Sequence, residues 1–489
     1  MTVLDEILEN NYEKIKSLRN QGINPFPSRF NITHTVLEAK KLPADSMTVC
    51  AGRIALLRLM GKAAFAHIND GTGKIQIYLK KDVLGQNKYE LFKKFADVGD
   101  FIGVEGRIFT THTGELTINV TGFSILSKSV RPLPEKWHGL QDHDVRYRDR
   151  HLDLIANEKV KKIFELKARI ISAVRQALDS TGYLEVETPI LCSTAGGASA
   201  KPFITYHNVY KSELYLRIAT ELYLKKLIIG GFNGVYEIGR VFRNEGIDTK
   251  HNPEFTLLEA YKAYSDYNGM AALVETLFRK CCEVAGQDVV EYNGMKINLK
   301  PPFRRISLPD MWLKACGSDI HEILKGKSFD KGKLISLADK TGAEYAKDTP
   351  CSKIFERIFD LKILPHLEQP CFVMDYPTAV TPLAKCMEGD SSIVERFEFF
   401  AGKEEIANAY SELNDPEDQK ERLLEQIRQR DEEKNQEADI LDKDFIEAME
   451  YGMPPTGGIG IGVDRLVMLF AGEPSIREVV LFPLLKPNI

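Results

Sequence analysis

Two segments far apart in the chain carry arginines in patterns that fix their local structure. The first runs from Gly234 to Tyr261 and reads GVYEIGRVFRNEGIDTKHNPEFTLLEAY. Both of its ends alternate with a period of two, which predicts two strands joined by a polar loop, that is, a long antiparallel hairpin. Phe255, Leu257, Glu259 and Tyr261 then share one face of the second strand. A chain with this hairpin must build a sheet around it.

The second segment, GGIGIGVDRLVML, runs from Gly457 to Leu469. Its glycine-rich half predicts a strand that other groups approach closely, and its apolar half predicts a helix. Arg465 falls in the first turn of that helix, where backbone N–H groups and the helix dipole already favour an anion. Together the two segments therefore indicate a nucleotide site.

In this order the segments resemble motifs 2 and 3 of the class II aminoacyl-tRNA synthetases, through FRNE and HNPEF and then GIGIGVDR. The segment from Ala168 to Leu191, ARIISAVRQALDSTGYLEVETPIL, resembles motif 1: an amphipathic helix, a turn at Gly182 and a strand ending at Pro189. Motif 1 is a dimer element in that family. The resemblance therefore implies a homodimer through motif 1 and a catalytic domain built on an antiparallel sheet.

A separate small domain is predicted near the N-terminus. Residues 1–30 read as an amphipathic helix closed by the proline-bearing connector NPFP. Five strands follow, with a short helix at 89–96 between the third and fourth. We expect the strands at 48–56, 63–69, 74–79, 101–109 and 116–126. This order matches an OB-fold barrel, which binds single-stranded nucleic acid on an aromatic and polar face.

The barrel resembles the anticodon-binding domain of the lysyl, aspartyl and asparaginyl synthetases. Its candidate anticodon-binding residues are Arg53, Phe65, His67 and Gln76. Phe65 would stack on an unpaired base, while Arg53 and Gln76 would hydrogen-bond to its Watson–Crick edge. All three families read an anticodon with a central uridine, so these residues indicate the subclass and not the amino acid.

The predicted fold class is α+β. We expect an OB-fold barrel at 31–127, a linker at 128–146 and a class II catalytic domain at 147–489, with a helical insertion at about 308–370. The insertion reads as helices broken by Gly317, Gly326, Gly342 and Pro350. The run 414–444 predicts a solvated helix, because its charges recur at i,i+4 spacing.

Metal candidates lie in FEFFAGKEEIANAYSELN, residues 397–414. If Gly402 and Lys403 make the turn, Glu398 pairs with Ala407 and shares a face with Glu405. Mg²⁺ prefers a few carboxylates together with phosphate oxygens, so this pair predicts a magnesium site; the resemblance implies about three ions per subunit. Asn408 and Glu412 have the opposite strand parity from Glu405, so a bulge is needed if all face one site.

The side-chain pocket decides which amino acid is activated. A lysine ammonium taken from water needs carboxylates beside it, whereas an aspartate pocket needs Arg or Lys. In lysyl-tRNA synthetases two glutamates flank the ammonium, and the matching segments here, LRIATELYLKKLIIGGF and NAYSELND, supply Glu221 and Glu412. The resemblance adds Gly197, Glu259, Tyr261 and Asn408 to the lysine-binding residues.

The chain departs from the commonest bacterial pattern of that family at a few positions. Thr220 stands in place of a proline, and Ala407, Ala409 and Tyr410 stand in place of Gly, Gly and Phe. None of these differences removes a charge, so the expected pocket is unaffected.

The resemblance also implies the roles at the ATP site. Arg243 and Mg²⁺ would neutralise the α-phosphate while the lysine carboxylate attacks it, and the tRNA(Lys) 3′-hydroxyl would then attack lysyl-adenylate. Phe255 and Arg465 would sandwich the adenine, which makes Arg243 and Arg465 the catalytic candidates. Glu245 near the adenine amino group, His251 at the γ-phosphate and Asn252 complete the ATP-binding set.

Composition restricts the setting. No apolar run approaches the ~20 residues of a membrane span, and MTVLDEILENNYEKIK is too charged for a signal peptide, so we expect a cytoplasmic protein with no membrane partner. Eight cysteines without CxxC spacing indicate neither zinc nor a disulfide framework. The net charge of −5 neither supports nor excludes a tRNA partner.

Three alternatives to a lysyl-tRNA synthetase remain open. Glu221 and Glu412 would repel the side chain that an aspartyl synthetase binds, and they suit the side chain of an asparaginyl synthetase poorly. A lysine ligase that acts on elongation factor P would lack the barrel. A non-catalytic RNA-binding paralogue predicts loss of motif residues, yet Arg243, Phe255 and Arg465 are all present.

Overall fold

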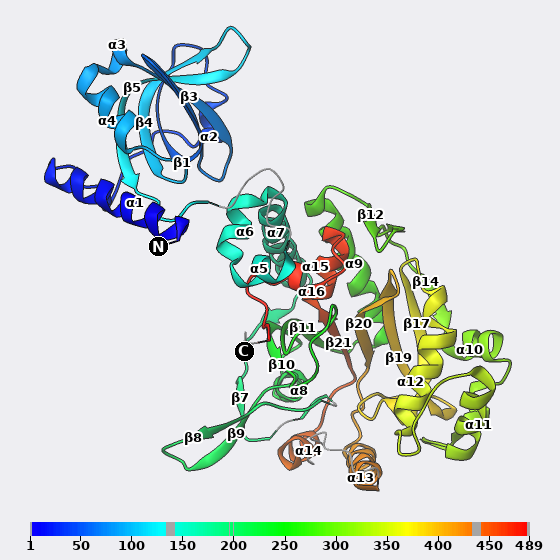
Figure 1. Ribbon diagram of the computed structural model, residues 1–489. Helices are drawn as coiled ribbons and strands as arrows, with labels where there is room; N and C mark the ends of the chain where they lie inside the picture. Colours follow the sequence, from blue (N-terminus) through cyan, green and yellow to red (C-terminus); the bar gives the residue numbers. More distant parts are fainter. Residues whose placement is uncertain (1, 134–141, 195, 199, 433–441, 487–489) are drawn as a thin grey trace. The chain divides into compact units, whose positions relative to one another are not determined.

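The computed structural model describes residues 2–133, 142–194, 196–198, 200–432 and 442–486 (Figure 1). The chain divides into two compact units, Met1–Gln141 and Asp142–Ile489. Residues 134–141 of the expected linker lie outside the described residues, as do residues 433–441 of the expected charged helix.

The first unit is the expected barrel. Its strands are β1 (Met47–Met60), β2 (Ala63–Asn69), β3 (Lys74–Lys80), β4 (Phe101–Thr110) and β5 (Leu116–Ser127), closed in the order β1-β2-β3-β5-β4. Alternate residues such as Ile54, Ile68, Ile77 and Val104 fill the interior, as the period-two pattern requires. The OB-fold prediction is confirmed by this order of strands and by a matching OB-fold family model.

Several helices accompany the barrel in this unit. The N-terminal helix α1 (Val3–Asn20) begins at a capping box between Thr2 and Asp5, and it packs Leu18 against Phe95 and Ile125. The short helix expected at 89–96 is α4 (Gln86–Phe95), preceded by α3 (Lys81–Leu84); α2 (Val36–Ala39) lies before the first strand.

The second unit is organised around one large, mainly antiparallel sheet. Its strand order is β14-β17-β19-β20-β21-β11-β10-β6, with β18 (Cys386–Met387) paired to β19. The strands are β14 (Arg304–Ser307), β17 (Cys371–Pro377), β19 (Asp390–Ala401), β20 (Glu404–Ser411), β21 (Thr456–Gly462), β11 (Glu254–Ala263), β10 (Gly234–Phe242) and β6 (Leu184–Glu185). The expected motif 2 hairpin is β10–β11, and the expected motif 3 is β21 followed by α15 (Val463–Ala471).

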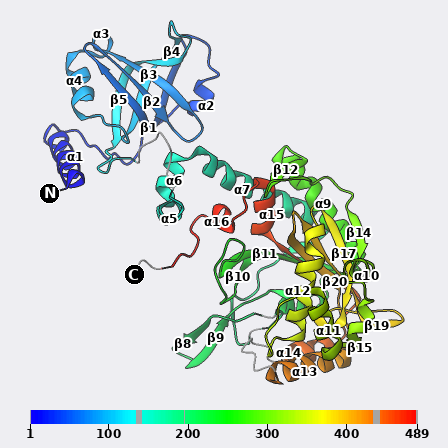
Figure 2. The same cartoon turned by 45° about the vertical axis from the view of Figure 1, so that its right-hand side comes forward.

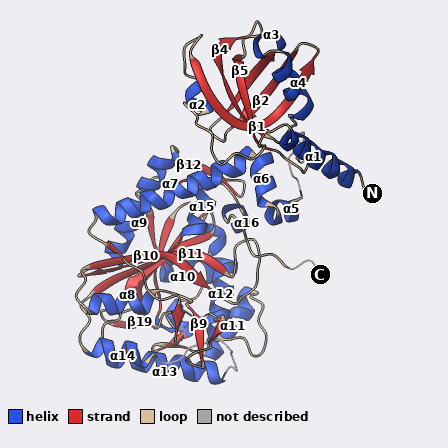
Figure 3. Ribbon diagram, turned by 90° about the vertical axis from the view of Figure 1, so that its left-hand side faces the viewer, coloured by secondary structure: helices blue, strands red, loops and turns tan. Residues whose placement is uncertain are grey.

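Three helices cover one face of this sheet: α7 (Glu158–Ser180), α9 (Tyr267–Ala285) and α15 (Figure 3). Their apolar residues form one core with alternate residues of the central strands, including Leu258 and Ala260 of β11 and Ile459 and Ile461 of β21. Because side chains alternate along a strand, the residues between these point to the opposite face. That opposite face carries the candidate site.

A fixed linkage joins the motif 1 helix to motifs 2 and 3. Lys167 of α7 places its Nζ 2.5 Å from Asp464 Oδ1, and the other oxygen of Asp464 accepts the Thr256 N–H at 2.7 Å. Asp464 is almost fully buried. The residues beside Thr256 and Asp464, Phe255 and Arg465, are thereby held in place.

The remaining elements pack around this sheet. They include α5 (His143–Arg148), α6 (Arg150–Ala156), α8 (Glu221–Ile229) and a small sheet of β7 (Leu191–Cys192), β8 (Ile204–His207) and β9 (Ser212–Leu216), of which Figure 2 labels β8 and β9. The others are a hairpin of β12 (Val289–Tyr292) and β13 (Met295–Asn298), a 3₁₀ turn η3 (Thr378–Val380), α13 (Pro416–Glu432), α14 (Lys443–Glu450) and α16 (Ile476–Val479).

The region expected as a helical insertion is only partly helical. It contains α10 (Leu308–Cys316), α11 (Lys331–Thr341), α12 (Cys351–Lys362) and 3₁₀ turns η1 (Ile320–Ile323) and η2 (Leu364–His366). Gly317 and Gly342 end helices in the left-handed conformation, as expected. Gly326, however, turns a small hairpin of β15 (Leu324–Lys325) and β16 (Ser328–Phe329), so the helical prediction was wrong there.

The solvated-helix prediction for 414–444 was also wrong in part. Gln419 and Arg422 of α13 are buried, and Arg422 donates to the Ala384 carbonyl while pairing with Asp418. An i,i+4 charge pattern therefore also fits a helix that packs one polar side against the body of the protein.

Candidate active site and nucleic-acid face

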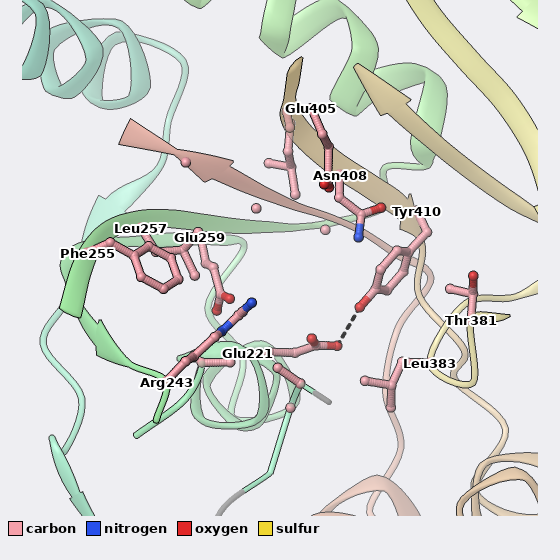
Figure 4. A pocket seen from close by; sticks show the side chains of 18 of the residues that line it. Glu221, Arg243, Phe255, Leu257, Glu259, Thr381, Leu383, Glu405, Asn408 and Tyr410 are labelled. Atoms are coloured by element: carbon pink, nitrogen blue, oxygen red, sulfur yellow. Dashed lines mark hydrogen bonds between the residues drawn. The ribbon is translucent and has the colours of Figure 1, made fainter. Parts of the chain in front are cut away.

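A cavity of about 480 Å³ lies on the face of the large sheet opposite α7, α9 and α15. It is lined by the motif 2 hairpin and its loop, the motif 3 strand, β20 and the start of α8. Figure 4 shows Arg243, Phe255, Glu259 and Glu221 on one side and Glu405, Asn408 and Tyr410 on the other. Segments more than 150 residues apart in sequence thus share one chamber.

Arg243 is the main positive charge of the cavity wall. It follows β10 directly, its guanidinium lies 5.2 Å from the centre of the Phe255 ring, and its Nε is buried without a hydrogen-bond partner among the described residues. Burial lowers the pKa of Arg243, and the nearby carboxylates of Glu245 and Glu259 oppose that shift. A largely buried guanidinium with unused donors is prepared to receive an anion.

Arg465 occupies the first turn of α15, as expected. Its Nη1 donates to the Glu405 carbonyl at 2.9 Å, and its Nη2 lies 3.4 Å from His251 Nε2. His251 in turn contacts Asp248 through Nδ1. Two residues assigned to the ATP site, one from motif 2 and one from motif 3, therefore meet at the cavity.

Asn252 and Glu245 are two further ATP-site candidates, and both lie in the motif 2 loop. Asn252 is buried, donates to the Glu254 carbonyl at 2.7 Å and leaves Oδ1 without a partner among the described residues. Glu245 is exposed at the mouth. Lys250, which the sequence analysis did not single out, also lines the cavity and pairs with Glu404 at 2.8 Å.

A bulge in β20 determines where the acidic candidates point. Glu398 pairs with Asn408, so the expected partner, Ala407, was wrong. The register shifts because Ile406 is an extra residue that turns into the core together with Ala407. As a result Glu405 reaches the same face as Asn408, and the bulge that the sequence analysis required is present.

The two candidate metal ligands, Glu398 and Glu405, fit a cation in part. Burial raises the pKa of Glu398, Arg396 opposes the shift, and the neighbouring Glu405 carboxylate adds to it. A cation would relieve that repulsion. Among the described residues no three His, Cys, Asp or Glu side chains gather as a metal cage, so the donor set suits an ion that takes further ligands from phosphate and water.

Arg396 is a residue that the sequence analysis missed. Its guanidinium donates to Asn408 Oδ1 at 2.9 Å, to Thr381 Oγ1 at 2.5 Å and to Glu398 Oε1 at 2.5 Å. It therefore orients one lysine-binding candidate and one metal candidate at once. Its position two residues before Glu398 on β19, hence on the same face, was the available signal.

The deep end of the cavity is acidic. Glu221 and Glu259 line it, and each is only 6% exposed. Burial, together with the Glu221 carboxylate, raises the pKa of Glu259 to about 7, against hydrogen bonds from Thr220. Gly197, with φ +87, faces Ala219 and Glu221, so its missing side chain leaves room at this end.

Tyr410 and Glu412 shape the wall behind Glu221. The Tyr410 hydroxyl donates to Glu221 Oε1 at 2.7 Å (Figure 4). Glu412 is 1% exposed, is not among the lining residues, and neither of its oxygens has a well-directed hydrogen bond from the described residues. Its one nearby cation within the described chain is Lys225, which makes an ion pair with it. Burial raises the pKa of Glu412.

The cavity thus brings most candidates together. Lining it are Gly197, Glu221, Arg243, Glu245, His251, Asn252, Phe255, Glu259, Tyr261, Glu405, Asn408 and Arg465. Glu398 and Glu412 stand just outside the lining, in contact with Arg396 and Lys225 respectively.

The outer face of the barrel collects three of its four candidates. Phe65 lies opposite Tyr78 with ring centres 4.7 Å apart, and His67 lies opposite Gln76 on the same strands. Glu115, missed in the sequence, joins the latter pair: it is 2.7 Å from His67 Nε2 and accepts from Gln76 Nε2 at 2.7 Å.

Arg53 is placed apart from this group. It pairs with Asn69, four residues along β2 from Phe65, and its guanidinium donates to the Gly99 carbonyl while lying over Phe101. The arginine opposite Phe65 is Arg58. A register shift between Ile54 and Leu56 separates the two, and sequence spacing alone does not show it.

Two further observations concern membrane-spanning helices and disulfide bonds. None of the helices in the described part combines the length and the apolar character that crossing a bilayer requires. No disulfide is found among the described cysteines.

Comparison with known proteins gives two family matches. Residues 142–486 match the model described as tRNA synthetases class II (D, K and N), and residues 48–126 match the OB-fold nucleic acid binding domain. The chain is 49% identical to a lysine–tRNA ligase of Thermoanaerobacter pseudethanolicus, covering 99% of this chain and 97% of that protein. It is 48% identical to a lysine–tRNA ligase of Carboxydothermus hydrogenoformans, covering 99% of each, and 49% identical to one of Pelotomaculum thermopropionicum.

Proposed function

The chain belongs to the class II tRNA synthetases (D, K and N), and from that premise we propose how its cavity carries out the reaction of a lysine–tRNA ligase. It acts as an aminoacyl-tRNA ligase that joins L-lysine to tRNA(Lys) with ATP as the energy source. The finer assignments below rest on the geometry of the cavity.

The observation that carries the assignment is the order of charges along the cavity. Glu221 lies at the deep end, Arg243 lies toward the mouth, and Glu259 is close enough to both for each to affect its pKa. This order matches a lysine molecule laid along the wall: side-chain ammonium at Glu221, α-ammonium at Glu259 and carboxylate near Arg243. Buried carboxylates need cations, and the substrate brings two.

The same order supports the chemistry at the α-phosphate. Arg243 neutralises charge on the phosphate as the lysine carboxylate attacks it in line and pyrophosphate leaves. Its unused Nε and its fixed place beside Phe255 mean that little reorganisation is needed when charge develops. No side chain here needs to act as a general base, because the lysine carboxylate is already ionised.

The roles in ATP binding are assigned from the residues at the mouth of the cavity. Phe255 and Arg465 present an aromatic face and a guanidinium plane between which an adenine ring fits. His251, 3.4 Å from Arg465, is placed for a terminal phosphate, and the exposed Glu245 for the adenine amino group. Asn252, with an unpartnered buried Oδ1, supports the loop.

Magnesium fits beside Glu405 and Glu398. When bound there it would supply positive charge to the triphosphate, and Arg396 keeps Glu398 oriented toward it. The number of ions is part of this proposal, with about three expected from the family resemblance.

An aspartate or asparagine substrate fits poorly. The wall at the deep end offers Glu221 and Glu259 and, behind them, Glu412. An aspartate side chain would meet these carboxylates directly, because Lys225 is already paired with Glu221 and Glu412 and Arg243 lies toward the mouth.

We extend the proposal to a homodimer built through motif 1. Leu184, Ile190 and Leu191 at the end of that motif are about half exposed, and the adjoining β8–β9 hairpin exposes further large apolar residues. These are Ile204, Tyr206, Val209 and Tyr210. A cluster of exposed apolar side chains is typical of a protein–protein contact, and a second copy of the chain is the expected partner. The proposal includes a cytoplasmic location, where ribosomes use charged tRNA.

The barrel is expected to bind the anticodon, and Phe65→Ala tests this. Loss of a stacking platform costs about 1–3 kcal/mol, so KM for tRNA(Lys) in aminoacylation should rise roughly 5- to 150-fold. Lysine-dependent ATP–pyrophosphate exchange, which needs no tRNA, should be unchanged. The control is Phe26→Ala, which removes an exposed ring of the same unit outside the barrel strands. Equal tRNA kinetics in the two variants would contradict the role of Phe65.

The direct test of the whole assignment is amino-acid-dependent ATP–pyrophosphate exchange with lysine, ornithine, aspartate and asparagine. Exchange with lysine is expected, and it should fall at least about 100-fold in kcat/KM in Glu221→Gln, since a buried carboxylate partner of the ammonium is lost. Exchange supported by aspartate or asparagine would overturn the pocket assignment. Absence of exchange with any of the four would favour an RNA-binding role without catalysis.

A further inference from the structure

A buried lysine of the protein itself lies behind the acidic end of the cavity. Lys225 follows Glu221 by one helical turn on α8, and its side chain is completely buried. Its Nζ is 2.5 Å from Glu221 Oε1 and makes an ion pair with Glu412 Oε2. A buried ammonium therefore bridges two carboxylates, one on the cavity wall and one behind it.

The surroundings of this ammonium are aromatic as well as acidic. The ring centres of Tyr410, Phe445 and Tyr261 lie 5.6, 5.8 and 6.0 Å from Lys225 Nζ. Ring faces at these distances attract a desolvated cation. Burial alone would lower the pKa of Lys225, but the carboxylates of Glu221 and Glu412 raise it. Lys225 is thus held in place as a cation.

The charges of Glu221, Lys225 and Glu412 do not cancel one another. Lys225 opposes the effect of burial on the pKa of Glu412, so the ion-paired group holds two carboxylate charges and one ammonium charge. Glu221 Oε1 is already occupied by Lys225 and by the Tyr410 hydroxyl. One carboxylate charge, reaching the cavity through Glu221 Oε2, is left for a ligand.

We propose that Lys225 is a positioning residue that sets the specificity of the site: it leaves the Glu221–Lys225–Glu412 group with a single uncompensated negative charge, which the side-chain ammonium of the substrate neutralises, while Glu259 meets the α-ammonium. Lys225 acts through Glu221 and Glu412 and does not itself touch the substrate. This inference rests on the proposed lysine pocket and assigns a role to a residue outside its lining.

Both single substitutions in the pair should disturb this charge. Lys225→Met leaves two buried carboxylates without their shared cation, and since neighbouring like charges cannot both stay ionised, the pair takes up a proton that Lys225 no longer keeps away from Glu221. Glu412→Gln leaves Glu221 neutralised by Lys225. In each case KM for lysine should rise at least about tenfold, with kcat changed far less.

The double variant separates charge from packing. Lys225→Met with Glu412→Gln replaces a buried ion pair by neutral residues of similar size, an exchange that proteins often tolerate. It restores one negative charge, on Glu221. KM for lysine should therefore return to within about threefold of the wild type, whereas independent structural effects would multiply to about 100-fold or more.

The experiment measures lysine-dependent ATP–pyrophosphate exchange in the full-length wild type, both single variants and the double variant, with unfolding temperatures for each. Lys226→Met is the matched control, because this neighbour on α8 points to Asp442 and lies outside the pair. If Lys225→Met does not fold, the comparison of Glu412→Gln with the double variant remains decisive.

The outcomes are distinct. Recovery in the double variant supports the charge-setting role of Lys225. A double variant as poor as the product of the single variants overturns it, while lysine exchange by the wild type leaves the proposed function intact. A wild type without lysine exchange would remove the proposed function itself, before the variants are compared.

Discussion

Arg243→Ala is expected to abolish lysine-dependent ATP–pyrophosphate exchange, with a loss of at least about 10³-fold in kcat. The guanidinium is largely buried, it has no ion-pair partner among the described residues, and it stands between the carboxylate end of the lysine site and the phosphate end of the ATP site. Removing it leaves Mg²⁺ alone to oppose the charge that develops on the α-phosphate.

The fold should survive this substitution. A buried charge without a partner costs stability, so the unfolding temperature of Arg243→Ala should be at least as high as that of the wild type. Sedimentation should still give twice the chain mass of 55.3 kDa. Arg243→Lys is the conservative control: it keeps the charge without the planar fork, and an intermediate loss is expected. Full exchange activity in Arg243→Ala would remove the residue from the mechanism.

Gly458→Ala is expected to damage the lysine site selectively. A Cβ at this position would lie 1.9 Å from Glu412 Oε1 and 2.5 Å from Tyr261 Cε1. Both side chains are buried, so neither moves freely, and overpacking of this kind costs about 1–3 kcal/mol. KM for lysine should rise roughly 5- to 150-fold, while KM for ATP, which binds toward Arg465, should stay the same.

The neighbouring glycine supplies the control for this substitution. A Cβ on Gly460 would approach nothing closer than 4.0 Å, so Gly460→Ala should leave the unfolding temperature unchanged, while Gly458→Ala lowers it. A Gly458→Ala variant with wild-type KM for lysine would show that Glu412 and Tyr261 yield easily, and the tight wall described above would then be unnecessary for binding.

The strands and their faces were accessible from sequence because the signal is local. Alternation along 255–261 placed Glu259 and Tyr261 together, and the register of β10 with β11 agrees. The glycine-rich strand and Arg465 in the following turn were equally readable. In these segments the pattern within one strand or helix is enough to predict which face each residue occupies.

The parts that escaped prediction depend on packing between distant segments. Lys225 follows Glu221 at i,i+4, a spacing that usually indicates an exposed helix pair. It is buried because Glu412, which directly follows β20, and the rings of Tyr410 and Phe445 approach it from distant segments. The pairing of Glu398 was wrong because a simple turn count cannot reveal an extra residue three positions beyond the turn. Arg53 was grouped with Phe65 by resemblance, and the sequence does not give the register of β1 against β2, which places Arg58 opposite Phe65.

The extra residue at position 406 has a consequence for how this chain tolerates change. Because Ile406 turns inward beside Ala407, every later residue of β20 keeps its side: Asn408 and Tyr410 toward the cavity, Ala409 toward the core. Deleting one residue here would turn the cavity-facing residues of β20 into the core and the core-facing residues toward the cavity, so polar groups would be buried and apolar ones exposed. The strand therefore tolerates another apolar residue of similar size at the buried position 406 better than any change in its number of residues, and insertions or deletions in this gene segment should be far more damaging than such exchanges.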